Sequence, residues 1–193
     1  EDETTKAGII FGERETLPVE ATQDDGSKNP YKQDEGIRYD ASLEAMASLK
    51  GLSELNLLTA GTSSQISDGA AAVLIVNETG LKRLGVKPRA RIKAMALAGD
   101  DPIMMLSAPI PATRKLLQKA SVKMEDVDLY EVNEAFASVP MAWTIETGAD
   151  PEKLNVNGGA IALGHPLGCT GAKLTATLLR EMGRRNTQYG IVS

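Results

Sequence analysis

The spacing of apolar and polar residues predicts strands and helices that alternate from residue 87 onward. The predicted strands are residues 90–99, 126–132, 154–162 (which ends in a loop) and 189–193, and the predicted helices are residues 111–120, 133–148 and 171–183. Such alternation is typical of an α/β layered domain whose sheet is mostly covered by helices.

The first 86 residues show a weaker pattern. Residues 13–41 are polar and rich in turn formers, which predicts an exposed loop. Helical spacing begins at Leu43 and predicts a short helix that ends at Gly51. Small apolar residues that end at 73–76 predict a buried strand, and a helix is expected over residues 78–86.

Two positions conflict with the predicted helices and strands. Pro140 falls inside the helix predicted to begin near Asn133, where an interior proline costs about 3 kcal/mol. We therefore expect a kink or an early break there. The sequence also ends at Ser193, where the last predicted strand has barely begun, and a sheet edge left in mid-strand suggests a truncated chain.

The composition is that of a globular chain without a general attraction to polyanions. Apolar residues make up 42% of 193 positions, which is enough to bury a core. The net charge of −5 gives no broad affinity for nucleic acid or for an anionic membrane. No stretch approaches the roughly 20 apolar residues that cross a bilayer, and the acidic start lacks a signal-peptide layout, so we expect a cytoplasmic protein.

The only cysteine and the only histidine both lie in residues 155–173, together with five glycines. Lone residues of these types exclude an internal disulfide and argue against a metal site. Dense glycines let the backbone approach a ligand and expose N–H groups, which favours a site for an anion or a thioester. The alternative is a tight strand-to-helix crossover that binds nothing.

Pro166 favours extended backbone at His165, so the imidazole can project from a rigid loop and act as a general base. A lone histidine often only satisfies a hydrogen bond. Cys169 lies near a predicted helix start, where a thiolate is stabilised, and could pair with His165 as a nucleophile. Alternatively, Cys169 packs as a small side chain between glycines. The local sequence leaves both interpretations open.

A second candidate segment, residues 132–138, follows a predicted strand. Asn133 either caps the next helix or holds a water or a substrate oxygen with its amide. Glu134 is expected in the first helical turn, where the helix dipole favours it without any catalytic role. In a third segment, the hydroxyls of Ser63, Ser64 and Ser67 either bond a ligand amide or form turns.

These three segments, in this order, resemble the thiolase family: TAGTSSQISDGAAAVL at 59–74, VNEAFAS at 132–138 and NVNGGAIALGHPLGCTGA at 155–172. The resemblance implies a thiolase-like layered α/β/α/β/α fold, built from two similar halves with a loop excursion between them. Residues 1–41 would be the tail of that excursion, residues 42–86 the last part of the N-terminal half, and residues 87–193 a truncated C-terminal half. Most of the first half and the last strands would be missing.

The resemblance also implies an acyl-CoA acyltransferase that performs Claisen condensation or thiolytic cleavage of a 3-ketoacyl-CoA. His165 matches the histidine that activates the nucleophilic cysteine and, with a water held by Asn133, forms an oxyanion hole. Ser64 matches a serine that contacts the pantetheine arm of coenzyme A. Coenzyme A and acyl-CoA would be substrates, no cofactor would be bound permanently, and the full-length protein would form a homo-oligomer.

Cys169 matches neither family cysteine, which favours its packing role. Both catalytic cysteines would lie outside these residues, so the chain alone is expected to be inactive. Two alternatives remain: a non-catalytic module that binds acyl-CoA or a partner protein, and a cysteine hydrolase that uses Cys169 and His165. The first two motifs favour a degradative bacterial thiolase for bulky substrates such as steroid side chains.

Overall fold

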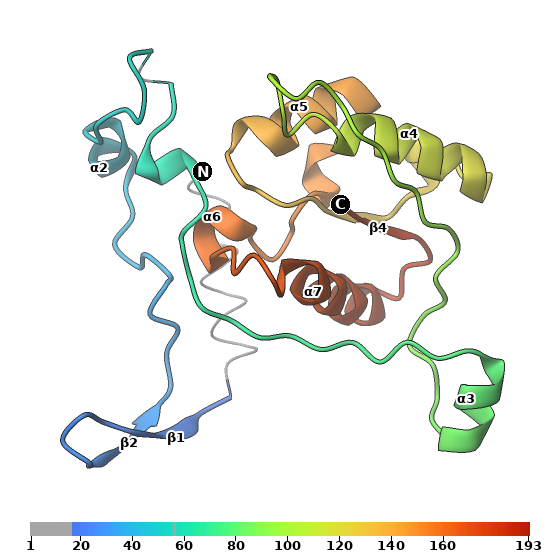
Figure 1. Cartoon of the computed structure of the whole chain (residues 1–193), viewed down its shortest axis with the longest axis horizontal. Helices are drawn as coiled ribbons and strands as arrows, with labels where there is room; N and C mark the ends of the chain where they lie inside the picture. The colour runs from blue at the N-terminus through green and yellow to red at the C-terminus, as the bar shows by residue number, and fades with distance from the viewer. Residues whose placement is uncertain (1–16, 56) are drawn as a thin grey trace.

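The computed structural model describes residues 17–55 and 57–193 (Figure 1). The strands are β1 (Val19–Thr22), β2 (Lys28–Tyr31), β3 (Leu129–Glu131) and β4 (Gly190–Val192). The α-helices are α2 (Leu43–Ala47), α3 (Glu78–Leu84), α4 (Pro109–Ala120), α5 (Ser138–Thr147), α6 (Ala160–Leu163) and α7 (Thr170–Arg185). Short 3-10 turns occupy Ala60–Thr62, Met124–Asp126 and Pro151–Lys153.

The packed part of the molecule is a small parallel sheet between two layers of helices. β3 pairs in parallel with β4, and a bridge from Tyr130 to Leu154 adds a third parallel segment. Helix α7 packs against β3 and β4, while α4 and α5 pack together on the other side (Figure 1). This α/β/α arrangement confirms the predicted α/β class and brings the carboxyl end of β3 to the middle of the molecule.

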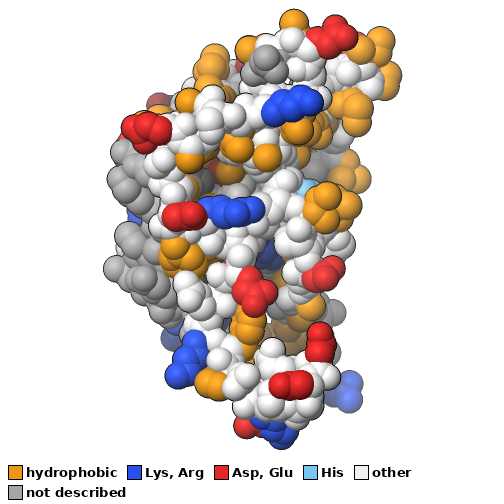
Figure 2. Space-filling view, turned by 90° about the vertical axis from the view of Figure 1, so that its left-hand side faces the viewer, with side chains coloured by type: hydrophobic (Ala, Val, Ile, Leu, Met, Phe, Trp, Pro, Cys, Tyr) orange, Lys and Arg blue, Asp and Glu red, His pale blue; other side chains and the backbone are white. Residues whose placement is uncertain are grey.

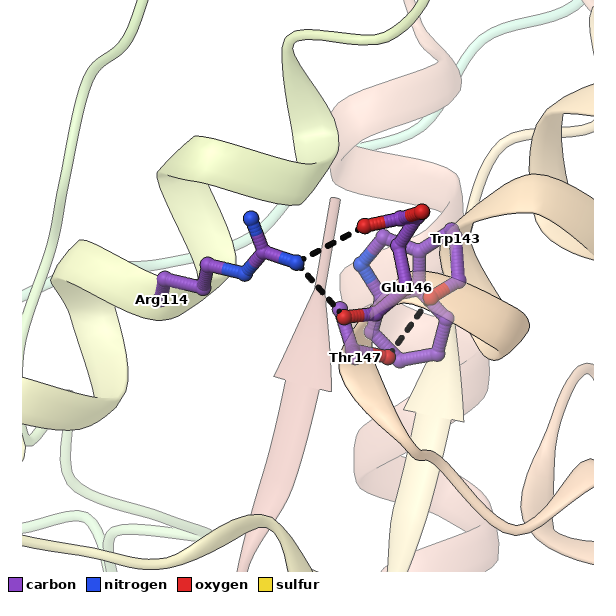
Figure 3. Close-up of polar contacts among 4 residues, drawn as sticks. All are labelled: Arg114, Trp143, Glu146 and Thr147. Atoms are coloured by element: carbon purple, nitrogen blue, oxygen red, sulfur yellow. Dashed lines mark hydrogen bonds and ion pairs between the residues drawn. The ribbon is translucent and has the colours of Figure 1, made fainter.

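Trp143 on α5 forms the centre of the apolar core. Its side chain is 0% exposed, its ring meets the Tyr130 ring edge-on at 5.3 Å, and its Nε1 donates to Thr113 Oγ1 on α4 at 2.9 Å. At the surface, Arg114 bonds both the main-chain oxygen and the carboxylate of Glu146 (Figure 3). An exposed ion pair contributes little, so the buried indole carries most of the energy that joins α4 to α5.

Several of the described helices end at a residue in the left-handed conformation. Gly85 closes α3 with φ +63°, as expected for a left-handed cap. Helix α5 begins at Ser138 rather than near Asn133, so Pro140 lies in the first turn, where its missing N–H would have had no helical partner. The predicted kink is therefore wrong. Helix α2 ends at Ala47, earlier than the predicted stop at Gly51.

Two predicted strands are wrong in this structure. Residues 73–76 and 90–99 have no strand pairing, and Leu74 and Leu97 are 74% and 88% exposed. A strand requires a hydrogen-bonding neighbour, and the described residues supply none for either segment. Figure 2 shows hydrophobic side chains gathered in patches on one face of the molecule.

The N-terminal segment follows its prediction only partly. Residues 17–41 lie mostly exposed, but they include an antiparallel hairpin of β1 and β2 that the polar pattern did not predict. Residues 1–16 of the predicted loop lie outside the described residues. In the described part of the chain, no helix combines the length and apolar character that a membrane crossing requires.

Candidate active site

Backbone hydrogen bonds bring the three candidate segments together. Residues 62–65 bond on one side to the loop after β3, through Ser64 N to Ala135 O at 3.1 Å and Ala137 N to Thr62 O at 2.9 Å. On the other side, His165 N donates to Gln65 O at 3.1 Å. Three segments that are far apart in the sequence therefore meet at the carboxyl end of β3.

Asn133 and His165 face one another across this junction. Asn133 follows β3, and His165 lies on the loop between α6 and α7, outside both helices as its proline neighbour predicted. The distance from Asn133 Nδ2 to His165 Nε2 is 3.4 Å. The structure thus brings together the two residues that the sequence singled out as a pair.

The hydrogen bonds of Thr170 favour one tautomer of His165. The single hydroxyl proton of Thr170 is donated to Pro166 O at 2.9 Å. Its oxygen can then only accept from His165 Nδ1, which lies 2.7 Å away. A neutral imidazole protonated at Nδ1 has its lone pair on Nε2, the nitrogen that faces the Asn133 amide donor. The ring therefore presents a base toward Asn133.

Burial keeps this base uncharged. Desolvation lowers the pKa of His165 below its ordinary value, and the positive charge of Lys173 lowers that pKa further. A neutral imidazole at physiological pH can accept a proton at Nε2 and afterwards donate the same hydrogen to a developing oxyanion.

Asn133 does not cap a helix. Helix α5 begins five residues later, with Ala137 in the cap position, so the capping interpretation is wrong. The backbone N–H of Asn133 donates to Ser193 O at 2.9 Å, and the buried Oδ1 of Asn133 has no partner among the described residues. A buried amide oxygen without a partner is costly, which suits a group that bonds a water or a substrate.

Ser64 lies on the segment that bonds both loops, and Cys169 lies four residues after His165. Ser64 is half-buried and directly precedes Gln65, the residue bonded to the His165 backbone. Cys169 immediately precedes α7 and lines a shallow hollow with residues 67–71 and 166–168. In the described part of the chain, Thr170 and Asn133 are the partners of the two ring nitrogens, so the geometry does not present a Cys169–His165 dyad.

We therefore predict that Cys169→Ala in the complete gene product changes the rate of thiolysis by no more than about twofold. The reason is that this substitution removes one sulfur at the edge of the hollow and leaves both contacts of His165 intact. Steady-state kinetics with a 3-ketoacyl-CoA measure the effect. Near-complete loss of activity would instead identify Cys169 as a nucleophile.

The sequence misassigned Glu134, which lies in the loop before α5 and not in a first helical turn. The side chain is 5% exposed and accepts hydrogen bonds from Asn155 Nδ2 at 2.9 Å and Ile161 N at 3.0 Å. The sequence analysis also missed Thr170. The only indication of its role along the chain is a hydroxyl one turn after Pro166. Both residues act through partners that spacing along the chain does not reveal.

A second buried carboxyl, Glu131, predicts a pH dependence of stability. Burial, followed by the charge of Glu134, raises the pKa of Glu131 from its ordinary 4.5 to about 8, and its Oε2 has no partner among the described residues. Between these two values the unfolded chain loses the proton that the folded chain keeps. The free energy of unfolding therefore falls as pH rises through this window.

Glu131→Gln should remove this dependence, because an amide stays neutral. Urea unfolding followed by circular dichroism at pH 5 and pH 8 measures the slope, with the exposed Glu125→Gln as the control. If Glu131→Gln keeps the same loss of stability between the two pH values as the control, Glu131 is not the responsible group.

Comparison with protein families gives matches over most of the chain. The C-terminal domain of thiolase matches residues 86–193, and the N-terminal domain of thiolase matches residues 4–79. A steroid 3-ketoacyl-CoA thiolase of Mycobacterium tuberculosis is 51% identical over 93% of this chain and 42% of its own length. A 3-ketoacyl-CoA thiolase of Klebsiella pneumoniae is 42% identical over 93% of this chain and 48% of its own length.

Solved structures give the same result. Human mitochondrial 3-ketoacyl-CoA thiolase superimposes with a TM-score of 0.90 at 37% identity, covering 98% of this chain and 49% of its own. The acetyl-CoA acetyltransferase of Bacillus anthracis also gives 0.90, at 36% identity, with coverage of 99% and 50%. The chain spans about half the length of the relatives it matches. On the family match and these identities, the chain belongs to the thiolase family.

Proposed function

We propose that this chain supplies the histidine and asparagine of a thiolase-type acyltransferase that cleaves or forms 3-ketoacyl-CoA. The observation that carries the proposal is the 3.4 Å approach of Asn133 Nδ2 to His165 Nε2. The contact of Thr170 with Nδ1 favours a proton on that other nitrogen. Relatives named 3-ketoacyl-CoA thiolase support the reaction type.

Each candidate residue has a distinct role in this proposal. His165 accepts the proton of a cysteine thiol that lies outside these residues, and its Nε2–H then faces the thioester oxygen as negative charge develops there. Asn133 holds a water beside the same oxygen, so two donors stabilise the oxyanion. Ser64, on the segment between the two loops, contacts the pantetheine arm of coenzyme A.

The substrates are coenzyme A and a 3-ketoacyl-CoA, with no permanently bound cofactor. A relative solved in complex with CoA supports coenzyme A as a substrate. The relative named as a steroid 3-ketoacyl-CoA thiolase supports a bulky acyl group on the 3-ketoacyl-CoA. We further propose that the complete protein is cytoplasmic and forms a homo-oligomer.

Thiolysis by the complete gene product tests the proposal. The assay follows CoA-dependent loss of acetoacetyl-CoA and of a bulkier 3-ketoacyl-CoA, with CoA omitted as the control. Cleavage that requires CoA supports the proposal. Binding of CoA without cleavage would indicate the non-catalytic module, and thioester hydrolysis by residues 1–193 without CoA would indicate a cysteine hydrolase.

A further inference from the structure

The helix that delivers His165 is too short to hold itself in place. Helix α6 has four residues, Ala160–Leu163, which amounts to one turn, and an isolated turn of helix is unstable in water. The loop continues through Gly164, whose φ of +83° is accessible mainly to glycine. Side chains from elsewhere in the fold must therefore set the position of the imidazole.

The amino end of α6 is held by a buried carboxylate. Glu134 Oε2 accepts from Ile161 N at 3.0 Å, and Glu134 Oε1 accepts from Asn155 Nδ2 at 2.9 Å. The approach is so close that a Cβ on Gly159 would overlap the Glu134 carboxyl group. A glycine at this position is therefore a steric requirement of the contact.

The carboxyl end of α6 is held by an ammonium group. Lys173, in the first turn of α7, donates from Nζ to Gly164 O at 2.7 Å and to Leu163 O at 3.3 Å. These carbonyls directly precede His165. A negative group at the amino end and a positive group at the carboxyl end are the arrangement that the helix dipole favours.

The same carboxylate is tied to the strand end that carries Asn133. Asn155 Nδ2 bonds Val132 O as well as Glu134, and Asn155 Oδ1 accepts from Val132 N, each at 2.9 Å. One network therefore reaches the residue before Asn133 and the helix before His165.

We propose that Glu134 and Lys173 form a clamp across α6 that sets the position of His165 relative to Asn133. Both are positioning residues, since neither is placed against the reacting atoms. This inference deepens the proposed function, but it can be tested without turnover, because His165 is the only histidine of the chain.

Nitrogen NMR of the imidazole is the direct test. In the 193-residue chain at about pH 8.5, where the imidazole is neutral with or without the charge of Lys173, His165 should give the two distinct 15N shifts of a ring protonated at Nδ1. Glu134→Gln and Lys173→Met should shift the signals toward a mixture of tautomers and broaden them. Lys173→Arg retains a charged donor and should preserve the wild-type pattern.

Two matched controls separate positioning from general destabilisation. Lys153 Nζ also donates to a backbone carbonyl, Val127 O at 2.9 Å, and Asp128 also accepts from backbone amides, those of Gln188 and Tyr189. Lys153→Met removes an equivalent bond and Asp128→Asn removes an equivalent negative charge elsewhere in the fold, so both should leave the His165 signals unchanged.

Kinetics of the complete gene product give a second readout. If the clamp positions the base, Lys173→Met should lower kcat about 10- to 100-fold with little change in KM, and Lys173→Arg should restore most of it. Wild-type tautomer signals in both clamp variants would overturn the proposal. An inactive wild-type gene product would refute the proposed function alone, because the NMR result would still decide on the clamp. If Glu134→Gln does not fold, the comparison of Lys173→Met with Lys173→Arg decides.

Discussion

Replacing His165 by alanine in the complete gene product is expected to lower kcat for thiolysis by roughly 100- to 10,000-fold, the range of a lost general base. Nε2 of this residue faces the Asn133 amide with its lone pair, so the substitution removes both the proton acceptor and one oxyanion donor. Steady-state kinetics should show the loss in kcat, with KM for CoA much less affected.

The control for this experiment is Thr175→Ala on α7, which removes a hydroxyl bonded to Gly171 O and no contact of His165. It should keep nearly full activity. If His165→Ala retained more than about one tenth of the wild-type kcat, the loss would be too small for a general base. The catalytic base would then have to be another residue.

Replacing Trp143 by alanine is expected to lower the free energy of unfolding by about 3–5 kcal/mol. The indole is completely buried between α4 and β3, where it packs edge-on against Tyr130. Its removal leaves a large cavity and also leaves the Thr113 hydroxyl without its donor. Urea unfolding followed by far-ultraviolet circular dichroism measures the change, since the only tryptophan of the chain is lost.

Met141→Ala on the same helix is the matched control. This side chain is 64% exposed, so its removal should change the free energy of unfolding by less than about 0.5 kcal/mol. Similar small effects for both substitutions would mean that α5 does not pack on the sheet as described.

Local chemistry predicted the helices of the C-terminal part well. The apolar spacing gave α4 and α7, and Gly85 ended α3 as expected. The predicted start of α5 near Asn133 was wrong. The spacing of apolar residues extends the helical pattern back to that position, but the backbone there bonds to residues 62–65 and Ser193 instead. Periodicity does not distinguish a helical turn from a loop held by distant partners.

The strands at 73–76 and 90–99 show a different limit. Their apolar composition predicted burial, but burial depends on a neighbouring strand, and the described residues do not provide one. Composition can indicate that a segment would form a strand. It cannot supply the partner.

For the site, the sequence singled out Asn133, His165 and Ser64, and the structure brings the segments that carry them together. Their roles stay predictions until the substitutions are made. Glu134 and Lys173 could not be recognised, because their partners lie 27 and 9 residues away and a charge beside a helix is usually solvated. Only the folded chain reveals that they act on one short helix.

The backbone hydrogen bonds of Ser193 support the segment that carries Asn133. Ser193 N donates to Glu131 O, and Ser193 O accepts from Asn133 N. Ser193 therefore bonds the backbone on both sides of Val132, the residue before the asparagine. Because both contacts are made by the backbone, replacing the Ser193 side chain leaves them in place, whereas Ser193→Pro would remove the N–H that bonds Glu131 O.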